Sequence, residues 1–305
     1  MFFYLIRKIG LRPAMIKLYT RVFHHDKLID SFCDRVGAGL YLSKYKRIID
    51  SFPREKCIEW LHNTSDMAVP KRIWLSWLQG YDNAPEIVKR CRESIYHFAP
   101  DFEIIEIDES NVRDYIDIPE CIDTKKKRGG LPYAHYSDYI RISLVEKYGG
   151  IWLDATIMLS GGLPKYVTHA SLFKYRSIPI AYVCNSIWVI SAQPQCPILT
   201  QWLRMFEAYW ANEKHLVSYS ISMIMWTMIV NSTPENVEIW NRVPFFSSDD
   251  CYHVQREWGG VVSAKRLEQI KKVSSVHKLT YKVSPAFEKK EGILYKAVLD
   301  GVLYK

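Results

Sequence analysis

The sequence lacks paired cysteines. Its 305 residues contain seven cysteines, an odd number, and none of them forms a Cys-x-x-Cys pair. Zinc-ribbon and thioredoxin-type sites are therefore excluded, and no disulfide framework is indicated. This use of cysteine predicts a protein of the reducing cytoplasm.

Long hydrophobic runs are also missing. The apolar run at residues 2–6 is broken by Arg7 and Lys8, so it is too short for a transmembrane span. Its charge follows the apolar part instead of preceding it, unlike a signal peptide. Residues 216–234 carry no charge, but serines and a threonine interrupt them. Their apolar residues fit one helical face, which predicts a buried core helix.

Several signatures of common ligand sites are absent. No Gly-x-Gly-x-x-Gly or Walker loop follows the first predicted strand, which excludes a standard dinucleotide or P-loop site. The net charge of +8 fits an anionic partner: a phosphorylated substrate, an anionic membrane surface or nucleic acid. The sequence lacks interleaved basic and aromatic repeats and any recognisable nucleic-acid module, so no nucleic acid is expected as a partner.

The first 65 residues read as a helical extension, followed by one α/β domain over residues 66–305. Within residues 1–23, apolar and basic residues separate onto opposite faces of two short predicted helices. This segregation predicts contact with an anionic membrane surface at the inner face of the cell membrane. The alternative is a helical appendage that packs on the main domain.

The α/β domain begins with a strand, a helix and a second strand. Residues 73–77 and 103–107 have strand patterns, and an apolar stripe over residues 87–98 predicts the helix between them. This order predicts a βαβ unit in a parallel sheet. Residues 125–130 (KKKRGG) are expected to form a basic, flexible loop.

The central stretch continues this pattern. Residues 137–148 predict an amphipathic helix, two glycines end it, and residues 151–153 form a short apolar strand followed by Asp154. A carboxylate at the end of such a strand is placed where open α/β sheets bind ligands. Asp138 and Arg141 are three residues apart, so they share one face of the helix.

Ser-Asp-x-x-Arg followed by Gly-Gly-Ile-Trp-Leu-Asp resembles the DXD-containing glycosyltransferases, in particular the bacterial capsular polysaccharide synthesis proteins. Other matching pieces within residues 66–284 are VPKRIWLSWLQG, DFEIIEID, CNSIWVISAQPQCPIL and VHKLTYK. The resemblance implies a GT-A fold, a Rossmann-like α/β sandwich that binds a nucleotide sugar, related to glycosyltransferase family 32. It implies hexosyl transfer, with retention, from a UDP-sugar to a lipid-linked capsular or exopolysaccharide oligosaccharide, with Mn²⁺ or Mg²⁺ as cofactor.

The resemblance also implies roles for single residues. Asp154, as the first acid of the D-x-D element, would contact the metal, the ribose or both. Asp138 would hydrogen-bond the donor sugar, and Arg141 would orient the sugar or phosphate. One of Trp74 and Trp77 would stack on the base, and the other would lie in the core. Asn185 would lie where the donor and acceptor sites meet, and Lys278 would contact a phosphate. His277 and Thr156 would ligate the metal together with Asp154.

One departure from the motif matters. Thr156 stands where the second aspartate of the triplet is expected and offers only one neutral oxygen. Two other functions stay open on the residues alone. An aspartyl-phosphate phosphatase would also end a strand in Leu-Asp-x-Thr. A non-catalytic scaffold or nucleic-acid-binding protein would fit the positive net charge.

Overall fold

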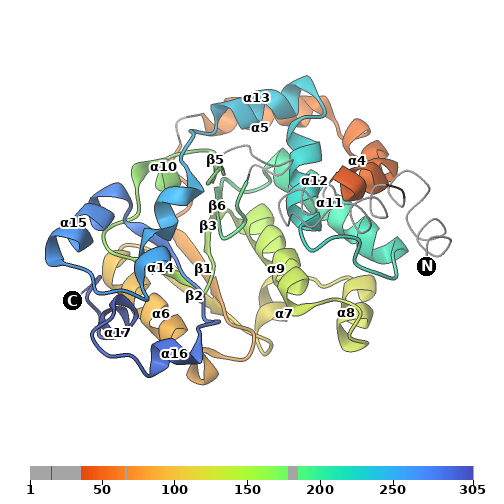
Figure 1. Cartoon of the computed structure of the whole chain (residues 1–305). Coiled ribbons are helices and arrows are strands. Elements are labelled where there is room, and N and C mark those ends of the chain that lie inside the picture. The colour runs from red at the N-terminus through yellow and green to blue at the C-terminus, as the bar shows by residue number, and fades with distance from the viewer. Residues whose placement is uncertain (1–14, 16–35, 66, 178–184, 305) are drawn as a thin grey trace.

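The computed structural model describes residues 15, 36–65, 67–177 and 185–304 (Figure 1). Its central sheet has five strands in the order β2-β1-β3-β6-β5. β1 is parallel to both β2 and β3, while β6 is antiparallel to β3 and β5 is antiparallel to β6. The strands are β1 (Arg72–Ser76), β2 (Glu103–Ile107), β3 (Gly150–Leu153), β5 (Leu172–Lys174) and β6 (Val189–Ala192).

A small second sheet lies beside the main one. β4 (Ile157–Leu159) pairs antiparallel with β7 (Val276–Lys278), with Ile157 opposite Lys278 and Met158 opposite His277. Only three residues separate the end of β3 from the start of β4. The second sheet therefore brings residues from late in the chain next to the end of β3.

Helices cover both sides of the main sheet (Figure 1). α9, α11 and α12 lie on one side, and α6 and α17 lie on the other. The helices are α4 (Lys46–Asp50), α5 (Arg54–Thr64), α6 (Glu86–Phe98), α7 (Val112–Tyr115), α8 (Glu120–Lys127), α9 (Tyr133–Tyr148), α10 (Lys165–Thr168), α11 (Pro197–Asn212), α12 (Ile221–Val230), α13 (Pro234–Arg242), α14 (His253–Glu257), α15 (Ala264–Val273), α16 (Pro285–Glu288) and α17 (Leu294–Leu299).

The predicted strand–helix–strand unit is confirmed as β1, α6 and β2, with the two strands parallel. The predicted core helix within residues 216–234 is α12, which is shorter than the uncharged run and buries Ile224, Met225 and Trp226. In the described parts of the chain, no helix has the length and apolar character needed to cross a membrane.

The described part of the N-terminal extension, residues 36–65, packs into the main core. Leu42, Ile49 and Trp60 are buried in the same apolar cluster as the sheet and α11. Trp60 also donates its indole N–H to the carbonyl of Pro194, at 3.2 Å. The predicted membrane-contacting segment, residues 1–23, lies outside the described residues apart from residue 15.

The expectation of a basic loop at residues 125–130 is wrong for residues 125–127, while residues 128–130 do form a turn after α8. The last turn of α8 contains Lys125, Lys126 and Lys127, and positive charge at this end of a helix interacts favourably with the helix dipole. Lys125 Nζ donates to the carbonyl of Glu213 at 2.7 Å, and Lys127 pairs with Asp123 one turn earlier. The sequence of a charged segment alone does not show which of its charges form hydrogen bonds or ion pairs in the folded protein.

The join between α9 and β3 requires glycine. Gly149 and Gly150 have φ values of +65° and +90°. Gly149 ends α9, and its carbonyl accepts the indole N–H of Trp74 at 2.9 Å. A Cβ on Gly150 would lie 2.6 Å from the carbonyl oxygen of Arg72 on β1. This close approach lets β3 lie beside β1 from its first residue.

We expect Gly150→Ala to lower the free energy of unfolding by about 2 kcal/mol or more, because a side chain there is strained and meets the backbone of β1. Urea denaturation followed by circular dichroism measures the change. Gly162→Ala is the matched control, since its Cβ would meet no atom within 4 Å. An equal loss of unfolding free energy in the two variants would contradict the conclusion that the backbone conformation of Gly150 and its closeness to β1 require glycine.

Candidate functional site

A cavity of about 1070 Å³ opens beyond the carboxyl ends of β1 and β3. Ser76 ends β1 and Asp154 follows β3, while Asp138 and Arg141 reach the cavity from α9 and Lys278 from β7. Sites for small molecules commonly measure about 300–1,000 Å³ and lie at this edge of α/β sheets. The cavity therefore has the position and size of a site for a large polar ligand.

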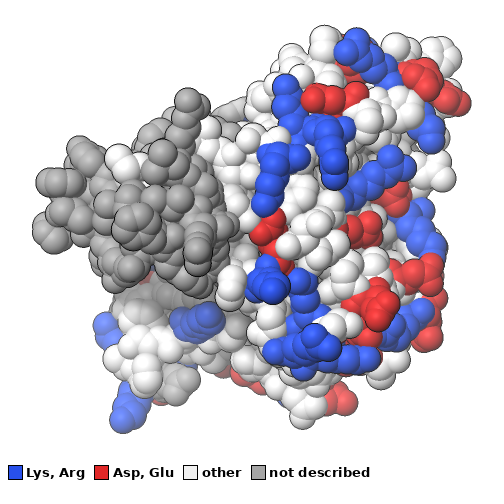
Figure 2. Space-filling model, turned by 90° about the vertical axis from the view of Figure 1, so that its right-hand side faces the viewer, with Lys and Arg blue, Asp and Glu red and all other residues white. Residues whose placement is uncertain are grey.

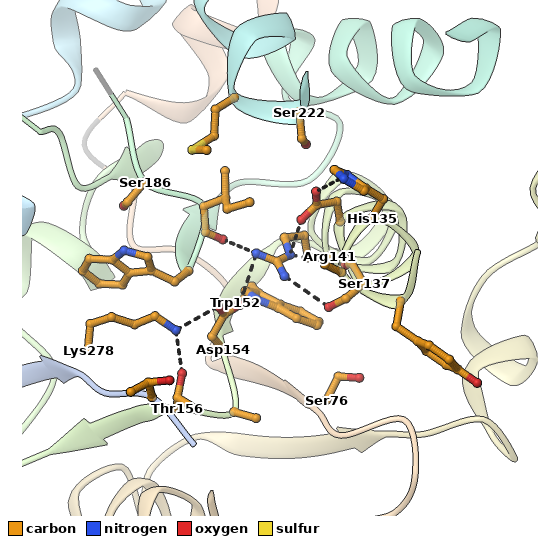
Figure 3. Close-up of a pocket in the computed structure, with 18 of the residues that line it drawn as sticks. Ser76, His135, Ser137, Arg141, Trp152, Asp154, Thr156, Ser186, Ser222 and Lys278 are labelled. Carbon is orange, nitrogen blue, oxygen red and sulfur yellow. Dashed lines mark hydrogen bonds and ion pairs between the residues drawn. The ribbon is translucent and has the colours of Figure 1, made fainter. Parts of the chain in front are cut away.

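The carboxylate of Asp154 is the meeting point of the site (Figure 3). Its Oδ1 accepts the indole N–H of Trp152 at 2.9 Å and lies 3.2 Å from Nη1 of Arg141. Its Oδ2 accepts from Nζ of Lys278 at 3.2 Å. Trp152 lies two residues earlier, so its side chain projects from the same face of the chain. Three elements of the fold thus converge on one carboxyl group.

Two opposing effects act on the pKa of Asp154. Burial raises it, but the positive charges of Arg141 and Lys278, helped by hydrogen bonds from Trp152 and Lys278, lower it below its usual value. Asp154 is therefore ionised at neutral pH. Its side chain keeps 21% of its surface exposed, so the carboxylate is open to the cavity.

Arg141 is held from several directions. Its Nη1 donates to the carbonyl of Ile187 at 2.8 Å, and its Nη2 donates to Oγ of Ser137 at 3.1 Å. Its Nε lies 3.5 Å from Oδ1 of Asp138. The guanidinium also lies over the ring of Trp152, 5.2 Å from the ring centre. This places one fixed cation between two carboxylates.

His135 lies beyond Asp138 on the same face of α9. Its Nδ1 lies 3.4 Å from Oδ2 of Asp138, one helical turn away on α9. The imidazole is 1% exposed, and neither ring nitrogen has a hydrogen-bond partner among the described residues. Tyr219 meets the ring edge-on, with 5.6 Å between ring centres.

Further cavity residues carry buried polar atoms that have no hydrogen-bond partner in the described parts of the chain. They are Oγ of Ser76, Nε1 of Trp77 and Oγ of Ser222, in addition to the two nitrogens of His135. Buried polar atoms are nearly always paired in folded proteins. Their gathering around one cavity indicates partners supplied by a hydroxyl-rich ligand or by ordered water.

Lys278 bridges Asp154 and Thr156. Its Nζ donates to Oγ1 of Thr156 at 2.5 Å as well as to Asp154. β7 lies beside β4 with Lys278 opposite Ile157, directly after Thr156 in the chain. The hydroxyl of Thr156, at the position of the expected second aspartate, therefore accepts a hydrogen bond from Lys278.

The expectation that His277 ligates a metal with Asp154 is corrected by the structure. Neighbouring residues of a strand point to opposite faces, so Lys278 faces the cavity and His277 faces the core. His277 has no exposed surface, and its Nε2 lies 2.7 Å from Oγ of Ser160. Burial lowers the pKa of His277 to about 3, which keeps it neutral.

Of the expected metal donors, Asp154 and Thr156 meet at Nζ of Lys278, whereas His277 is buried in the core and does not line the cavity. In the described parts of the chain, no three His, Cys, Asp or Glu side chains gather into a metal site made by the protein alone. Each carboxylate oxygen of Asp154 already has a cationic partner, and Lys278 also donates a hydrogen bond to the hydroxyl of Thr156. This donor set does not fit a resident divalent cation, which needs several free oxygen ligands.

Of the two tryptophans at β1, one lies in the core and the other lines the cavity. Trp74 is 1% exposed and packs among Tyr115, Tyr148 and the guanidinium of Arg72. Trp77 lines the cavity, where Tyr281 meets it edge-on with 5.3 Å between ring centres.

Asn185 lines the cavity and is held by a buried lysine. Its Oδ1 accepts from Nζ of Lys174 at 3.0 Å. Lys174 has no exposed surface, and its Nζ lies 3.7 Å from the ring centre of Trp226. Burial lowers the pKa of Lys174 well below its usual value. The amide of Asn185 is therefore fixed by a residue that itself lies beneath the cavity.

Sequence reasoning missed His135, Ser137, Trp152 and Lys174. Helical spacing could have found His135, which is three residues before Asp138 and hence on the same face. The strand period of two could have found Trp152 beside Asp154. No local signal marks Lys174, because its partner Asn185 is reached only through the pairing of β5 with β6.

The chain is similar to known proteins. A family model described as "Capsular polysaccharide synthesis protein" matches residues 42–298. The O-glycosyltransferase braB of Annulohypoxylon truncatum is 27% identical over 195 residues, which are 57% of this chain and 46% of that protein. The chain thus spans about half the length of this curated relative. The solved PaToxG glycosyltransferase is 13% identical with a TM-score of 0.43, covering 90% of this chain and 97% of its own.

The charge cluster predicts a pH-dependent stability difference. At pH 7 we expect Asp154→Asn to lower the free energy of unfolding by about 2 kcal/mol, because Arg141 and Lys278 lose their shared anion. The folded-state pKa of Asp154 is depressed, so its contribution is full above the unfolded pKa and is lost as the pH falls through the folded pKa. Urea denaturation at pH 7 and at pH values from about 4 down to about 2 should show the two proteins converging only below the unfolded pKa of about 3.9.

The control for this prediction is Asp101→Asn, at an exposed turn position. It should match the unmodified protein at every pH. A deficit of Asp154→Asn that stays constant with pH would show that the charge of Asp154 is not the cause.

Proposed function

This chain belongs to the family of capsular polysaccharide synthesis proteins, and we propose that it is a glycosyltransferase with a GT-A arrangement. It moves a hexosyl group from a nucleotide sugar, a UDP-sugar, to a growing lipid-linked oligosaccharide of a capsule or exopolysaccharide. The name of the relative, an O-glycosyltransferase, supports transfer to a hydroxyl oxygen.

The observation that carries this proposal is the convergence of Arg141 and Lys278 on Asp154 at the floor of the cavity. Two fixed cations at the edge of the sheet suit a ligand with a diphosphate. The unpartnered polar atoms of Ser76, His135 and Ser222 around the same cavity suit a ligand with many hydroxyl groups. A nucleotide sugar combines both properties in one molecule.

The reaction joins the acceptor to the sugar. An acceptor hydroxyl oxygen bonds to the anomeric carbon, while the bond from this carbon to the diphosphate oxygen breaks. We propose that both events occur on one face of the sugar, with retention, and that the acceptor proton passes to the departing diphosphate. The cations near Asp154 stabilise the charge that develops on the leaving group.

Within this scheme the two carboxylates have different tasks. Asp138 lies beside His135 and Arg141 and accepts hydrogen bonds from the donor sugar. Asp154 orients Arg141 and Lys278 and contacts the ribose. Trp77 lies at the end of β1 and contributes an aromatic face for the base.

We expect UDP-sugars to raise the melting temperature, since a ligand that binds only the folded state stabilises it. A thermal-shift screen of UDP-, GDP- and TDP-sugars identifies the donor. With this donor, Asp138→Asn should lower the transfer rate by about 100-fold while the protein stays folded, because a group positioned for the transition state is lost.

Asp101→Asn again serves as the matched control and should keep full activity. If none of the nucleotide sugars stabilises the protein, the transferase proposal fails. Full activity of Asp138→Asn would instead reject only the role given to this carboxylate.

We further propose that residues 1–23 bind an anionic membrane surface, as their pattern predicts. Figure 2 shows that Lys and Arg on the face beside the undescribed residues alternate with Asp and Glu, so this face is not a surface of one charge. The membrane contact is therefore assigned to residues 1–23 themselves. Flotation with phosphatidylglycerol vesicles should be lost when residues 1–23 are deleted, and equal flotation would reject the proposal.

A further inference from the structure

Departure of a nucleoside diphosphate leaves negative charge that must be neutralised, commonly by a divalent cation. In the described parts of the chain, no three His, Cys, Asp or Glu side chains gather to hold such an ion by themselves. The cavity does offer a fixed positive charge in the corresponding place. Lys278 Nζ lies between Oδ2 of Asp154 and Oγ1 of Thr156, the two side chains of the Asp-x-Thr triplet that would otherwise face a metal.

We infer that Lys278 takes the place of the divalent cation, so that the diphosphate site works without a metal. This inference rests on the proposed function, because it concerns how the same cavity holds a diphosphate. An ammonium group offers three donors. Two of them are used by Asp154 and Thr156, and the third is left for a phosphate oxygen.

The position of Lys278 is set by the backbone. β7 and β4 pair over three residues, and Leu279 N donates to the carbonyl of Thr156 at 2.9 Å. The side chain of Lys278 is 17% exposed, so it is mostly buried but can still be reached by a ligand in the cavity. The lysine is therefore presented at the triplet by sheet pairing, and not by a freely moving loop.

Arg141 completes the arrangement on the other oxygen of the same carboxylate. Its Nη1 lies 3.2 Å from Oδ1 of Asp154. A metal ion bound to Asp154 would have to enter between two cations that already occupy this group, and it would repel both. A diphosphate that meets Arg141 and Lys278 directly encounters no such conflict.

Mn²⁺ alone is the first probe. Electron paramagnetic resonance of free Mn²⁺, with no nucleotide present, should show that the protein leaves the ion in solution and that Asp154→Asn gives the same signal. Stoichiometric binding of Mn²⁺ that Asp154→Asn abolishes would overturn the inference. This measurement does not depend on the identity of the donor.

UDP is the second probe, measured by calorimetry in EDTA and in Mn²⁺. We expect the same Kd in both buffers to within about twofold. Lys278→Met should weaken binding by about 10-fold or more in both buffers, since a desolvated charge pair is lost, and Lys278→Arg should retain it. Lys272→Met, at an exposed position on α15 outside the cavity, is the matched control and should bind as the unmodified protein does.

Binding of UDP only in the presence of Mn²⁺ would overturn the inference, as would unweakened binding by Lys278→Met. Circular dichroism melts show whether each variant is folded, and Lys278→Arg keeps the test decisive if Lys278→Met unfolds. If UDP binds in neither buffer, the choice of a UDP-sugar fails, while the Mn²⁺ measurement still decides whether Asp154 holds a metal at the place that the inference gives to Lys278.

Discussion

The site depends on one buried guanidinium. Arg141 has little contact with solvent, so its charge must be neutralised and its donors used within the protein. Asp138 and Asp154 provide the charge, while Ser137 and the carbonyl of Ile187 take further N–H groups. Because these partners come from α9, from the end of β3 and from the segment before β6, the guanidinium ties three parts of the fold together. Two carboxylates thus face two cations before any ligand arrives, and the electrostatics of the cavity are organised in advance.

The parts of the site that could be predicted from the sequence are local. The helix that carries Asp138 and Arg141, the glycines that end it and the strand before Asp154 form one continuous stretch. Residue spacing on a helix decides which side chains share a face, and this is independent of the remainder of the chain. The parallel pairing of β1 and β2 was predictable for a similar reason, since a strand–helix–strand order leaves few topologies.

The parts that could not be predicted depend on distant pairing. Because side chains alternate along a strand, the sequence predicts that only one of His277 and Lys278 in the three-residue strand β7 faces the site. It does not predict which of the two this is. That choice depends on the register with β4. The resemblance to glycosyltransferases implied a phosphate contact at Lys278 and metal ligation at His277, whereas the register with β4 presents only Lys278 to the cavity. In the same way, the lysines at the end of α8 have partners on other elements that the sequence alone does not connect.

The small β4–β7 sheet has a consequence for the order in which the molecule is completed. Lys278 follows Asp154 by 124 residues in the chain, yet it contacts this carboxylate directly. Contacts of such long sequence separation carry a loop-closure entropy cost that makes them slow to form. During synthesis, α9, β3 and Asp154 emerge from the ribosome long before their second cation exists. The charge cluster around Asp154 is therefore incomplete until β7 has been made and has docked, so that an assembled site marks completion of the fold.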